Sequence, residues 1–514
     1  MQKYLAGIDL GTTGARCILF DLTGTPVASK YCAYESTSYP KPTWVEQSVD
    51  EMLEKTFLAC RSVMGENDIK PEQVASIGFS VQRSVTCLID QDGDVLGNAI
   101  SWQDTRANDC VEGMRKTSAN SGGNVDPDRF YQLSGLPWGP MWLLSKLLWL
   151  RENEPQRFAQ AVKVVQFSDV VLKAFGADDF YSDHSTTVFY GCWDVAARTW
   201  SDELLDLFQL SADLFGKPIA PGKQIATLPL GVAEKTGFAP GTPVAVGAGD
   251  QNCATVGMGA IKSGVATVTL GTCGMAILAT DKPAEGFGGM MTTNHAIADL
   301  WEIEGITNAA ASAYQWLRNT VSAELPFSQL NALAENSPVG SRGLLFLPFL
   351  ATAATPRWNS QARGSLLGMT FAHTKEDVIR AVMEGVTLEI RDVMQRWTQK
   401  GYAVDTLRIA GGATRSELWN QIQADVYGKP VETLACDEAT CLAAAMFGGV
   451  AVGEFKTIDE AVGEMVKVDK LIEPNEKNHA IYEELYDCYS TTYNALNEGE
   501  AFSKLAKMQE NAEK

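Results

Sequence analysis

The 514-residue sequence is poor in basic residues and in histidine. It has 42 Lys and Arg against 63 Asp and Glu, a formal net charge of -21, and only four histidines. A nucleic-acid-binding face needs clustered basic side chains, so this charge argues against a nucleic acid partner. The histidines lie far apart in the sequence, which argues against a histidine-rich metal site. A local phosphate site remains compatible with the acidity, because backbone N–H groups can bind phosphate without basic side chains.

Paired cysteines and long apolar runs are also missing. The 11 cysteines are scattered singly, with no CxxC pair or regular spacing, so they do not indicate a disulfide framework. The first residues lack the cationic start and the apolar segment of a signal peptide. No run of about eighteen apolar residues is present for a membrane span. We therefore expect a cytoplasmic protein whose cysteines are reduced.

The remaining composition is that of a globular chain with more than one domain. Hydrophobic residues make up 45% and charged residues 20%, which is ordinary for a folded protein. At 514 residues the chain is too long for one core and fits two or three domains.

Two segments far apart in the chain resemble each other. Residues 4–20 (YLAGIDLGTTGARCILF) and residues 264–280 (GVATVTLGTCGMAILAT) both indicate a strand, an LGTxG turn and a second strand. Their separation is too long for a solenoid, whose repeats are about 20–50 residues. We interpret them as the starts of two domains of one design, spanning residues 1–258 and 259–496. A charged helical tail is predicted at residues 497–514.

The glycine turns are candidates for phosphate binding, because glycine lets backbone N–H groups approach an anion closely. The first turn offers Gly11, Thr12 and Thr13, with Asp9 before it as a magnesium ligand and Arg16 after it as a phosphate contact. The second turn begins at Gly271 and Thr272 and keeps the donors without the aspartate. Taken singly, each turn could also be a plain hairpin. Two such turns together favour a polyphosphate site.

A third glycine pair, Gly411 and Gly412, follows a predicted strand at residues 407–410 and precedes a predicted helix at 417–427. This arrangement lets the backbone lie flat against a base or a ribose. Two glycines before a helix are also a common structural feature, so the pattern is weak by itself.

Asp250 stands at the junction of a predicted strand (242–249) and a predicted helix (251–257). A carboxylate at a strand end beside glycines can accept the proton of a hydroxyl that attacks a phosphoryl group. The alternative is an N-cap aspartate for the helix. The residues alone do not decide between these two roles.

Taken in order, the motifs resemble the FGGY carbohydrate kinases, which belong to the superfamily of actin-like ATPases. The matching segments cover residues 4 to about 451 and include GIDLGTTGAR, GFSVQRSVTCLID, ISWQDTRA, SKLLWLREN, VGAGDQNCATVG and GLLFLPFLATAATPRWNSQARGSLLGM. The resemblance implies an α/β fold of two duplicated actin-like ATPase (ribonuclease H-like) domains with an interdomain cleft. It also implies ATP-dependent phosphorylation of a hydroxyl of a small sugar or polyol.

The resemblance assigns roles to particular residues. Asp250 would be the catalytic base, and Mg²⁺ would lie near Asp9 and Asp250. The residues implied for ATP binding are Gly11, Thr12, Thr13, Arg16, Gly271, Thr272, Ala311, Gln315, Gly411, Gly412, Ser416 and Asn420. Those expected to bind the acceptor are Gln82, Arg83, Asp250 and Gln251. Trp102, Asp104 and Arg106 are expected to form an acceptor wall for a hydroxyl-rich substrate, because Asp and Arg bind hydroxyls and an indole can cover the carbon face of a sugar.

The acceptor site departs from the known patterns of the family. Arg83 matches a polyol-binding position of glycerol kinases, but Ser84 and Met141 stand where those enzymes have glutamate and tyrosine. Xylulokinases carry Met-His where this chain has Arg83 and Ser84. For Arg106 a structural salt bridge is the alternative. We expect a ketopentose such as xylulose, or a four- to six-carbon polyol.

Rival interpretations remain open at this stage. A glycerol kinase is one alternative, and a non-catalytic actin-like nucleotide switch or a sugar-binding regulator that has lost catalysis are others. We expect a small sugar or polyol as the partner, with no nucleic acid and no membrane. The sequence does not decide whether the chain forms a homodimer.

Overall fold

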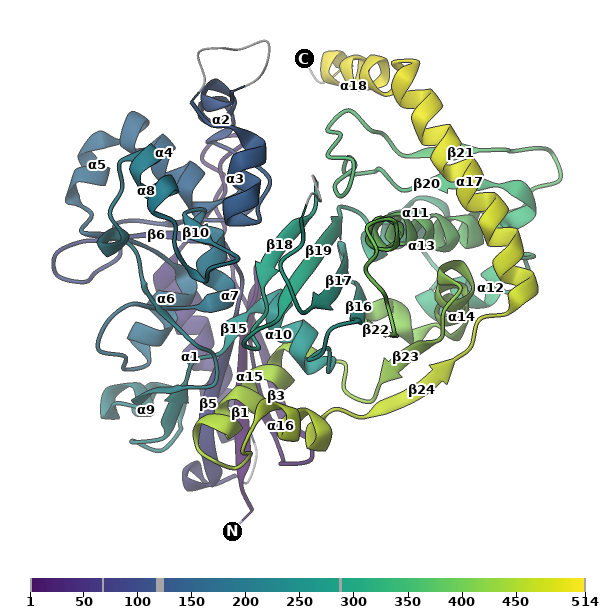
Figure 1. Cartoon of the computed structure of the whole chain (residues 1–514). Coiled ribbons are helices and arrows are strands. Elements are labelled where there is room, and N and C mark those ends of the chain that lie inside the picture. The colour runs from purple at the N-terminus through teal and green to yellow at the C-terminus, as the bar shows by residue number, and fades with distance from the viewer. Residues whose placement is uncertain (1, 67–68, 117–123, 286–288, 513–514) are drawn as a thin grey trace. The chain divides into compact units, whose positions relative to one another are not determined.

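The computed structural model describes residues 2–66, 69–116, 124–285 and 289–512 (Figure 1). Contacts between Cα atoms divide the chain into two units. The first comprises Met1–Lys262, Thr280–Glu302 and Glu438–Lys467, and the second comprises Ser263–Ala279, Ile303–Asp437 and Val468–Lys514. Each unit therefore combines segments that are distant in sequence. The predicted domain limits at residues 258 and 496 remain predictions.

The first unit contains a large mixed sheet in the order β13-β14-β5-β1-β2-β3, with β15 also paired to β5. The strands of this unit are β1 (Tyr4–Leu10), β2 (Gly14–Phe20), β3 (Pro26–Ala33), β4 (Glu46–Gln47), β5 (Val74–Val81), β6 (Thr86–Ile89), β7 (Ala99–Ile100), β8 (Lys163–Gln166), β9 (Tyr181–Asp183), β10 (Trp193–Asp194), β11 (Thr199–Trp200), β12 (Lys217–Ile219), β13 (Gln224–Thr227), β14 (Pro243–Ala245), β15 (Ala248–Gly249) and β18 (Met291–Asn294).

The helices of the first unit are α1 (Val49–Gly65), α2 (Asn108–Met114), α3 (Pro127–Ser134), α4 (Leu143–Asn153), α5 (Pro155–Gln160), α6 (Phe167–Ala174), α7 (His184–Thr187), α8 (Asp202–Phe208), α9 (Leu230–Thr236), α10 (Asp250–Gly257), α15 (Ala439–Ala451) and α16 (Ile458–Met465). Helix α1 begins after Ser48, whose side chain accepts a hydrogen bond from the Glu51 N–H. The acidic residues of its first turn, Asp50 and Glu51, suit the positive end of the helix dipole.

Helices α1 and α15 cover opposite faces of this sheet. Because side chains alternate along a strand, Ile8 and its partner Cys17 share one face, where they belong to the same core as Cys60 of α1. Gly7, on the other face, lies against α15. A Cβ built on Gly7 would come within 1.9 Å of the Cys441 backbone oxygen. Glycine is needed here because the helix backbone touches the strand backbone.

The second unit contains β19-β17-β16-β22-β23-β24 as neighbouring strands in that order. Its strands are β16 (Val265–Leu270), β17 (Gly274–Thr280), β19 (Trp301–Thr307), β20 (Leu345–Leu347), β21 (Ser365–Leu367), β22 (Thr406–Ala410), β23 (Val431–Leu434) and β24 (Val468–Ile472). Its helices are α11 (Ala311–Val321), α12 (Phe327–Ala334), α13 (Lys375–Gln399), α14 (Glu417–Tyr427), α17 (Glu476–Glu498) and α18 (Ala501–Ala512).

The two sheets repeat one topology, as the similar sequence segments predict. In the first unit β1 is antiparallel to β2 and parallel to β5. In the second unit β16 is antiparallel to β17 and parallel to β22. The α/β fold of duplicated actin-like units is therefore confirmed. One local prediction was wrong, since residues 242–249 form two short strands, β14 and β15, each paired with β5.

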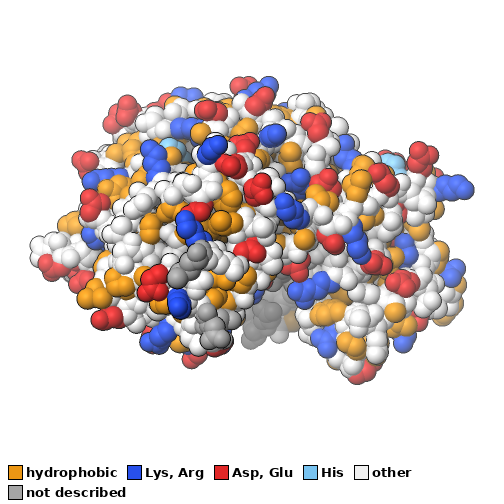
Figure 2. All heavy atoms as spheres, turned by 90° about the horizontal axis from the view of Figure 1, so that it is seen from below, with side chains coloured by type: hydrophobic (Ala, Val, Ile, Leu, Met, Phe, Trp, Pro, Cys, Tyr) orange, Lys and Arg blue, Asp and Glu red, His pale blue; other side chains and the backbone are white. Residues whose placement is uncertain are grey.

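The surface and the helices add two further observations. On the face shown in Figure 2, Lys and Arg side chains lie interspersed with Asp and Glu side chains. None of the helices among the described residues has both the length and the hydrophobicity of a membrane-spanning segment.

Candidate active site

Asp9 lies at the carboxyl end of β1, next to the equivalent end of β5. The two strands are parallel, and Asp9 is in register with Ser80. The Ser80 hydroxyl donates a hydrogen bond of 2.6 Å to Asp9 Oδ1. The register of these strands therefore fixes the position of the carboxylate at the edge of the sheet where parallel strands end.

Asp250 follows β15 at the same edge of the same sheet. Strand β15 is parallel to β5, with Ala248 opposite Ser80. Asp250 is the first residue of α10, and the N-cap of that helix is Gly249, with no capping side chain. The N-cap alternative for Asp250 is thus not supported. Its side chain keeps 26% of its surface exposed, which leaves the carboxylate accessible.

Asp9 is partly buried and lies within the electrostatic influence of the carboxylates of Asp250 and Glu438. Burial raises the pKa of Asp9 from the ordinary value of 3.8 to about 7, against the lowering effect of the Ser80 hydrogen bond. The negative charges of Asp250 and Glu438 also contribute to this rise. Mg²⁺ is commonly held by one or two carboxylates with water and phosphate oxygens as the other ligands. The oxygens of Asp9 and Asp250 fit such an ion, although no cluster of three or more ligands occurs among the described residues.

The first glycine turn connects β1 to β2 and is tied to the predicted acceptor wall. The Gly11 N–H donates to the Gly14 carbonyl oxygen at 3.0 Å, which closes the hairpin. The Trp102 indole N–H donates to Thr12 Oγ1 at 2.9 Å, and the Gln47 amide donates to the Thr12 carbonyl oxygen at 2.8 Å. Thr12 is therefore held from two sides, whereas Thr13 is exposed.

Arg16 and Gln82 both have protein partners. Arg16 forms a salt bridge with Glu438, just before α15, and its guanidinium lies over the Tyr31 ring. The buried Gln82 amide donates to Gln47 Oε1 at 3.2 Å. Each side chain is thus fixed beside the first turn by a residue that sequence reasoning did not select.

Arg83 contacts the predicted catalytic carboxylate. Its Nε lies 3.5 Å from Asp250 Oδ1, and its side chain is only 9% exposed. The guanidinium also lies 4.4 Å from the centroid of the Phe189 ring. Gln251, next to Asp250 on α10, is partly buried. The structure therefore brings Arg83 and Asp250 together at the sheet edge that carries Asp9, and Gln251 is the next residue of α10.

Asp104 and Arg106 form a buried ion pair, which favours the salt-bridge alternative for Arg106. Arg106 Nη2 lies 2.8 Å from Asp104 Oδ2 and 2.8 Å from Glu46 Oε1. The side chains of both Asp104 and Arg106 have no exposed surface. The Arg106 guanidinium also lies over Trp44 at 3.9 Å from the ring centroid. This pair can support the Trp102 segment from behind.

The two positions that depart from the glycerol kinase pattern contact each other. Ser84 Oγ donates to the Met141 carbonyl oxygen at 2.7 Å. Lys146 Nζ donates to the Ser84 carbonyl oxygen at 2.8 Å, and burial lowers the pKa of Lys146 to about 7. Ser84 also has a positive φ of 61°, which is uncommon for a residue other than glycine.

In the second unit, the second glycine turn lies beside the start of α11. The Ala311 N–H donates to the Gly271 carbonyl oxygen at 2.8 Å, and Ser312 Oγ donates to the Thr272 carbonyl oxygen at 2.7 Å. Helix α11 therefore presents its positive end next to this turn. Gln315, one turn further along the helix, is bonded to Asn319.

The glycine pair after β22 lies directly behind this second turn. A Cβ on Gly411 would come within 2.5 Å of the Leu270 oxygen, whereas Gly412 faces open space. The Ser416 side chain caps α14. Asn420 is nearly buried, and its Oδ1 has no hydrogen-bond partner within the described part of the chain. The predicted nucleotide residues of this unit thus lie near one another.

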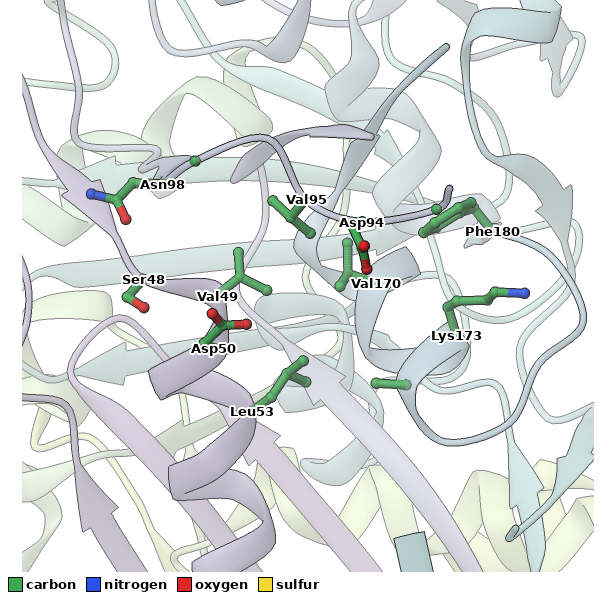
Figure 3. Close-up of a pocket in the computed structure, with 13 residues that line it drawn as sticks. Ser48, Val49, Asp50, Leu53, Asp94, Val95, Asn98, Val170, Lys173 and Phe180 are labelled. Carbon is green, nitrogen blue, oxygen red and sulfur yellow. The ribbon is translucent and has the colours of Figure 1, made fainter. Parts of the chain in front are cut away.

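A cavity of about 510 Å³ lies in the first unit (Figure 3). Asp50 and Leu53 of α1, Asp94 and Val95 of the β6–β7 connection, and Lys173 of α6 are among the residues that line it. None of the predicted site residues belongs to its lining.

The duplicated α/β topology and the carboxylates at its strand ends define the class of actin-like ATP-dependent phosphotransferases. Residues 4–257 match the N-terminal domain, and residues 266–452 the C-terminal domain, of the FGGY family of carbohydrate kinases. The chain belongs to this family. It is accordingly an ATP-dependent carbohydrate kinase.

Individual relatives agree with the family. The chain is 29% identical over 500 residues to a xylulose kinase of Bacillus subtilis (strain 168), covering 96% of this chain and 97% of the relative. It is 30% identical over 505 residues to a glycerol kinase of the same organism, covering 94% and 97%. The ligand-bound xylulose kinase from Lactobacillus acidophilus superposes with a TM-score of 0.90 at 26% identity, covering 98% of this chain and 100% of that chain.

Sequence reasoning missed several residues that hold the site. Ser80 could have been found, because it lies near the end of β5 and in register with Asp9, near the end of the parallel strand β1. Asn252, which contacts Arg83 at 3.2 Å, lies in the VGAGDQNCATVG segment two residues after Asp250, but nothing in that segment indicated its contact with Arg83. Glu302, which accepts a hydrogen bond from the Asn252 amide, and Glu438, which pairs with Arg16, lie far from these partners in the sequence, and no local pattern pointed to them.

Proposed function

We propose that this kinase transfers the γ-phosphoryl group of ATP to a hydroxyl of a small sugar or polyol with Asp250 as the general base. The observation that carries the proposal is the proximity of Asp250, Asp9 and Arg83 at one sheet edge. Asp250 would accept the proton of the acceptor hydroxyl, leaving its oxygen free to attack the phosphorus in line. Arg83 would orient the acceptor beside this carboxylate.

Asp9 and Asp250 would hold Mg²⁺ through carboxylate oxygens or bound water. When bound, the ion neutralises charge on the transferred phosphoryl group. The glycine turns that begin at Gly11 and Gly271 would donate backbone N–H groups to the phosphates. The residues after β22 would hold the adenosine, with Asn420 Oδ1 as a candidate acceptor for the nucleotide.

For the acceptor we propose a ketopentose such as xylulose, or a four- to six-carbon polyol. The relatives named as xylulose kinases support the first choice, since they align over nearly the whole chain. Glycerol is the second candidate, because Arg83 matches the glycerol kinase pattern and a glycerol kinase is 30% identical. The residue types of Ser84 and Met141 weigh against glycerol, since both replace polyol-binding side chains of that pattern.

ADP release tests the acceptor class. Xylulose, four- to six-carbon polyols, ketohexoses, sugar acids and glycerol would be compared at equal concentration with Mg·ATP. We expect the highest kcat/KM with xylulose or a longer polyol. Turnover stimulated by glycerol alone would establish the alternative, and ATP consumption that no acceptor stimulates would favour a nucleotide switch.

Replacement of Asp250 tests the base. In Asp250→Asn and Asp250→Ala, kcat should fall by about 10²–10⁴-fold, because proton removal in the transition state is lost. Binding of a non-hydrolysable ATP analogue, measured by calorimetric titration, should persist. Near-normal turnover in either variant would overturn the assignment.

The cytoplasmic location and a homodimer remain predictions, to be checked by cell fractionation and by light scattering.

A further inference from the structure

Asn252 forms a buried bridge between Arg83 and Glu302. Its side chain is fully buried in α10, and its Oδ1 accepts a hydrogen bond of 3.2 Å from Arg83 Nη1. Its Nδ2 donates to Glu302 Oε2 at 2.7 Å and to the Asn294 carbonyl oxygen at 3.3 Å. All of these residues belong to the first unit.

The chemistry of the partners fixes the orientation of this amide. A guanidinium only donates hydrogen bonds, and a carboxylate only accepts them. The Asn252 oxygen must therefore face Arg83, and its NH₂ group must face Glu302. In this orientation each bond polarises the amide in the same sense, which strengthens the chain of hydrogen bonds.

Two further contacts restrict Arg83. An ideal Cβ on Gly249 would lie 2.6 Å from Arg83 Cδ, so the missing side chain leaves room for the arginine stem. On the other side, the guanidinium packs over the Phe189 ring. Together with Asn252, these contacts hold the guanidinium 3.5 Å from Asp250 Oδ1.

Glu302 is itself fully buried, beside a histidine that remains neutral. His295 Nε2 lies 3.4 Å from Glu302 Oε1, but burial lowers the pKa of His295 to about 4. Its Nδ1 accepts the Ile297 N–H at 2.9 Å, so Nε2 carries the proton and can donate to the Ala260 carbonyl oxygen. His295 therefore supplies no positive charge to Glu302 near neutral pH.

We propose that Asn252 and Glu302 are positioning residues that determine acceptor specificity by fixing the direction of Arg83 beside Asp250. The inference rests on the proposed acceptor-binding role of Arg83. A guanidinium held in one direction can bind only an acceptor whose hydroxyls are correctly placed. Loosening the bridge lets Arg83 move, which weakens binding of the proper acceptor and reduces discrimination among acceptors.

Kinetics of Asn252→Ala test this proposal. A hydrogen bond to a charged group is lost, so the acceptor KM should rise on the order of 10-fold. The ATP KM should stay unchanged, because Asp9 and the glycine turns are untouched. Ser134→Ala is the control, since it removes a different buried polar group of the first unit, the hydroxyl that donates to the Phe130 carbonyl oxygen in α3. That control should leave both KM values unchanged.

A double-mutant cycle separates positioning from a merely structural role. In an Arg83→Ala background, Asn252→Ala should raise the acceptor KM no further, because there is no guanidinium left to position. If the effects of the two substitutions multiply, the proposal is wrong. Loss of thermal stability with an unchanged acceptor KM in Asn252→Ala would also overturn it.

Glu302→Gln is a second variant that tests the same proposal if Asn252→Ala does not fold. The glutamine retains an oxygen for the Asn252 NH₂ but removes the charge, so the acceptor KM should rise less than in Asn252→Ala. This rise should again occur only when Arg83 is present. An unchanged KM would contradict the proposal. Failure of the proposed function is distinguishable, because wild-type protein would then phosphorylate none of the screened acceptors.

Discussion

The indole N–H of Trp102 donates a 2.9 Å hydrogen bond to Thr12 Oγ1. Trp102 belongs to the predicted acceptor wall, and Thr12 belongs to the first phosphate turn. A single bond thus joins the two predicted substrate regions of the first unit. We therefore expect a displacement of either side chain to shift the position of the other.

We expect Trp102→Phe to weaken both substrates. The phenylalanine keeps an aromatic face but loses the donor to Thr12, so the KM values for ATP and for the acceptor should each rise about 2–10-fold. Steady-state kinetics with each substrate varied in turn would measure this. Trp138→Phe is the matched control, because it removes an indole N–H bonded to the Val111 carbonyl oxygen. A rise in the acceptor KM alone would show that the bond to Thr12 does not couple the two regions.

We expect Asp9 to make the stability of the ligand-free protein depend on pH. Its pKa is 3.8 in an ordinary setting and about 7 in the folded chain, so between these values the folded state binds more protons than the unfolded state. Stability should therefore fall as pH rises from 3.8 to about 7, and this fall should be smaller in Asp9→Asn. Thermal unfolding across this range measures the difference between the two proteins.

The effect of Mg²⁺ on thermal unfolding is a second comparison of the wild type with Asp9→Asn. Above pH 7, Mg²⁺ should raise the Tm of the wild type more than that of Asp9→Asn, because the ion offsets the ionised, poorly solvated carboxylate. Equal responses of the two proteins would argue against Asp9 as a magnesium ligand. Equal pH profiles would argue against its raised pKa.

We expect Arg106→Met to act mainly on stability. The substitution leaves the Asp104 carboxylate buried without its partner, which costs about 3–5 kcal/mol of unfolding free energy. Urea denaturation would measure this cost. Arg129→Met is the matched control, since the Arg129–Glu203 pair is about half exposed on both sides and should cost at most about 1 kcal/mol. A higher acceptor KM without loss of stability would instead restore Arg106 to the acceptor wall.

Much of the local structure could be read from the sequence. Apolar runs on both sides of the LGTxG turns at Gly11 and Gly271 predicted both hairpins, and the structure confirms them as β1–β2 and β16–β17. The helix after Gly412 was predicted at residues 417–427, which are the limits of α14. The position of Asp250 was also clear, but its local sequence fitted an N-cap as well as a base. The structure argues against the N-cap role, because Gly249 occupies the N-cap position of α10.

Sequence by itself determined the family, the duplicated design and the candidate carboxylates, because these depend on local patterns and on ordered motifs. Tertiary structure decided which side chains meet. It buried Arg106 against Asp104, joined Trp102 to Thr12, and brought Asn252 and Glu302 together although fifty positions separate them. Such contacts follow from strand register and helix packing over long separations. No local sequence pattern carries that information, so the partners of Arg83 could be known only from the folded chain.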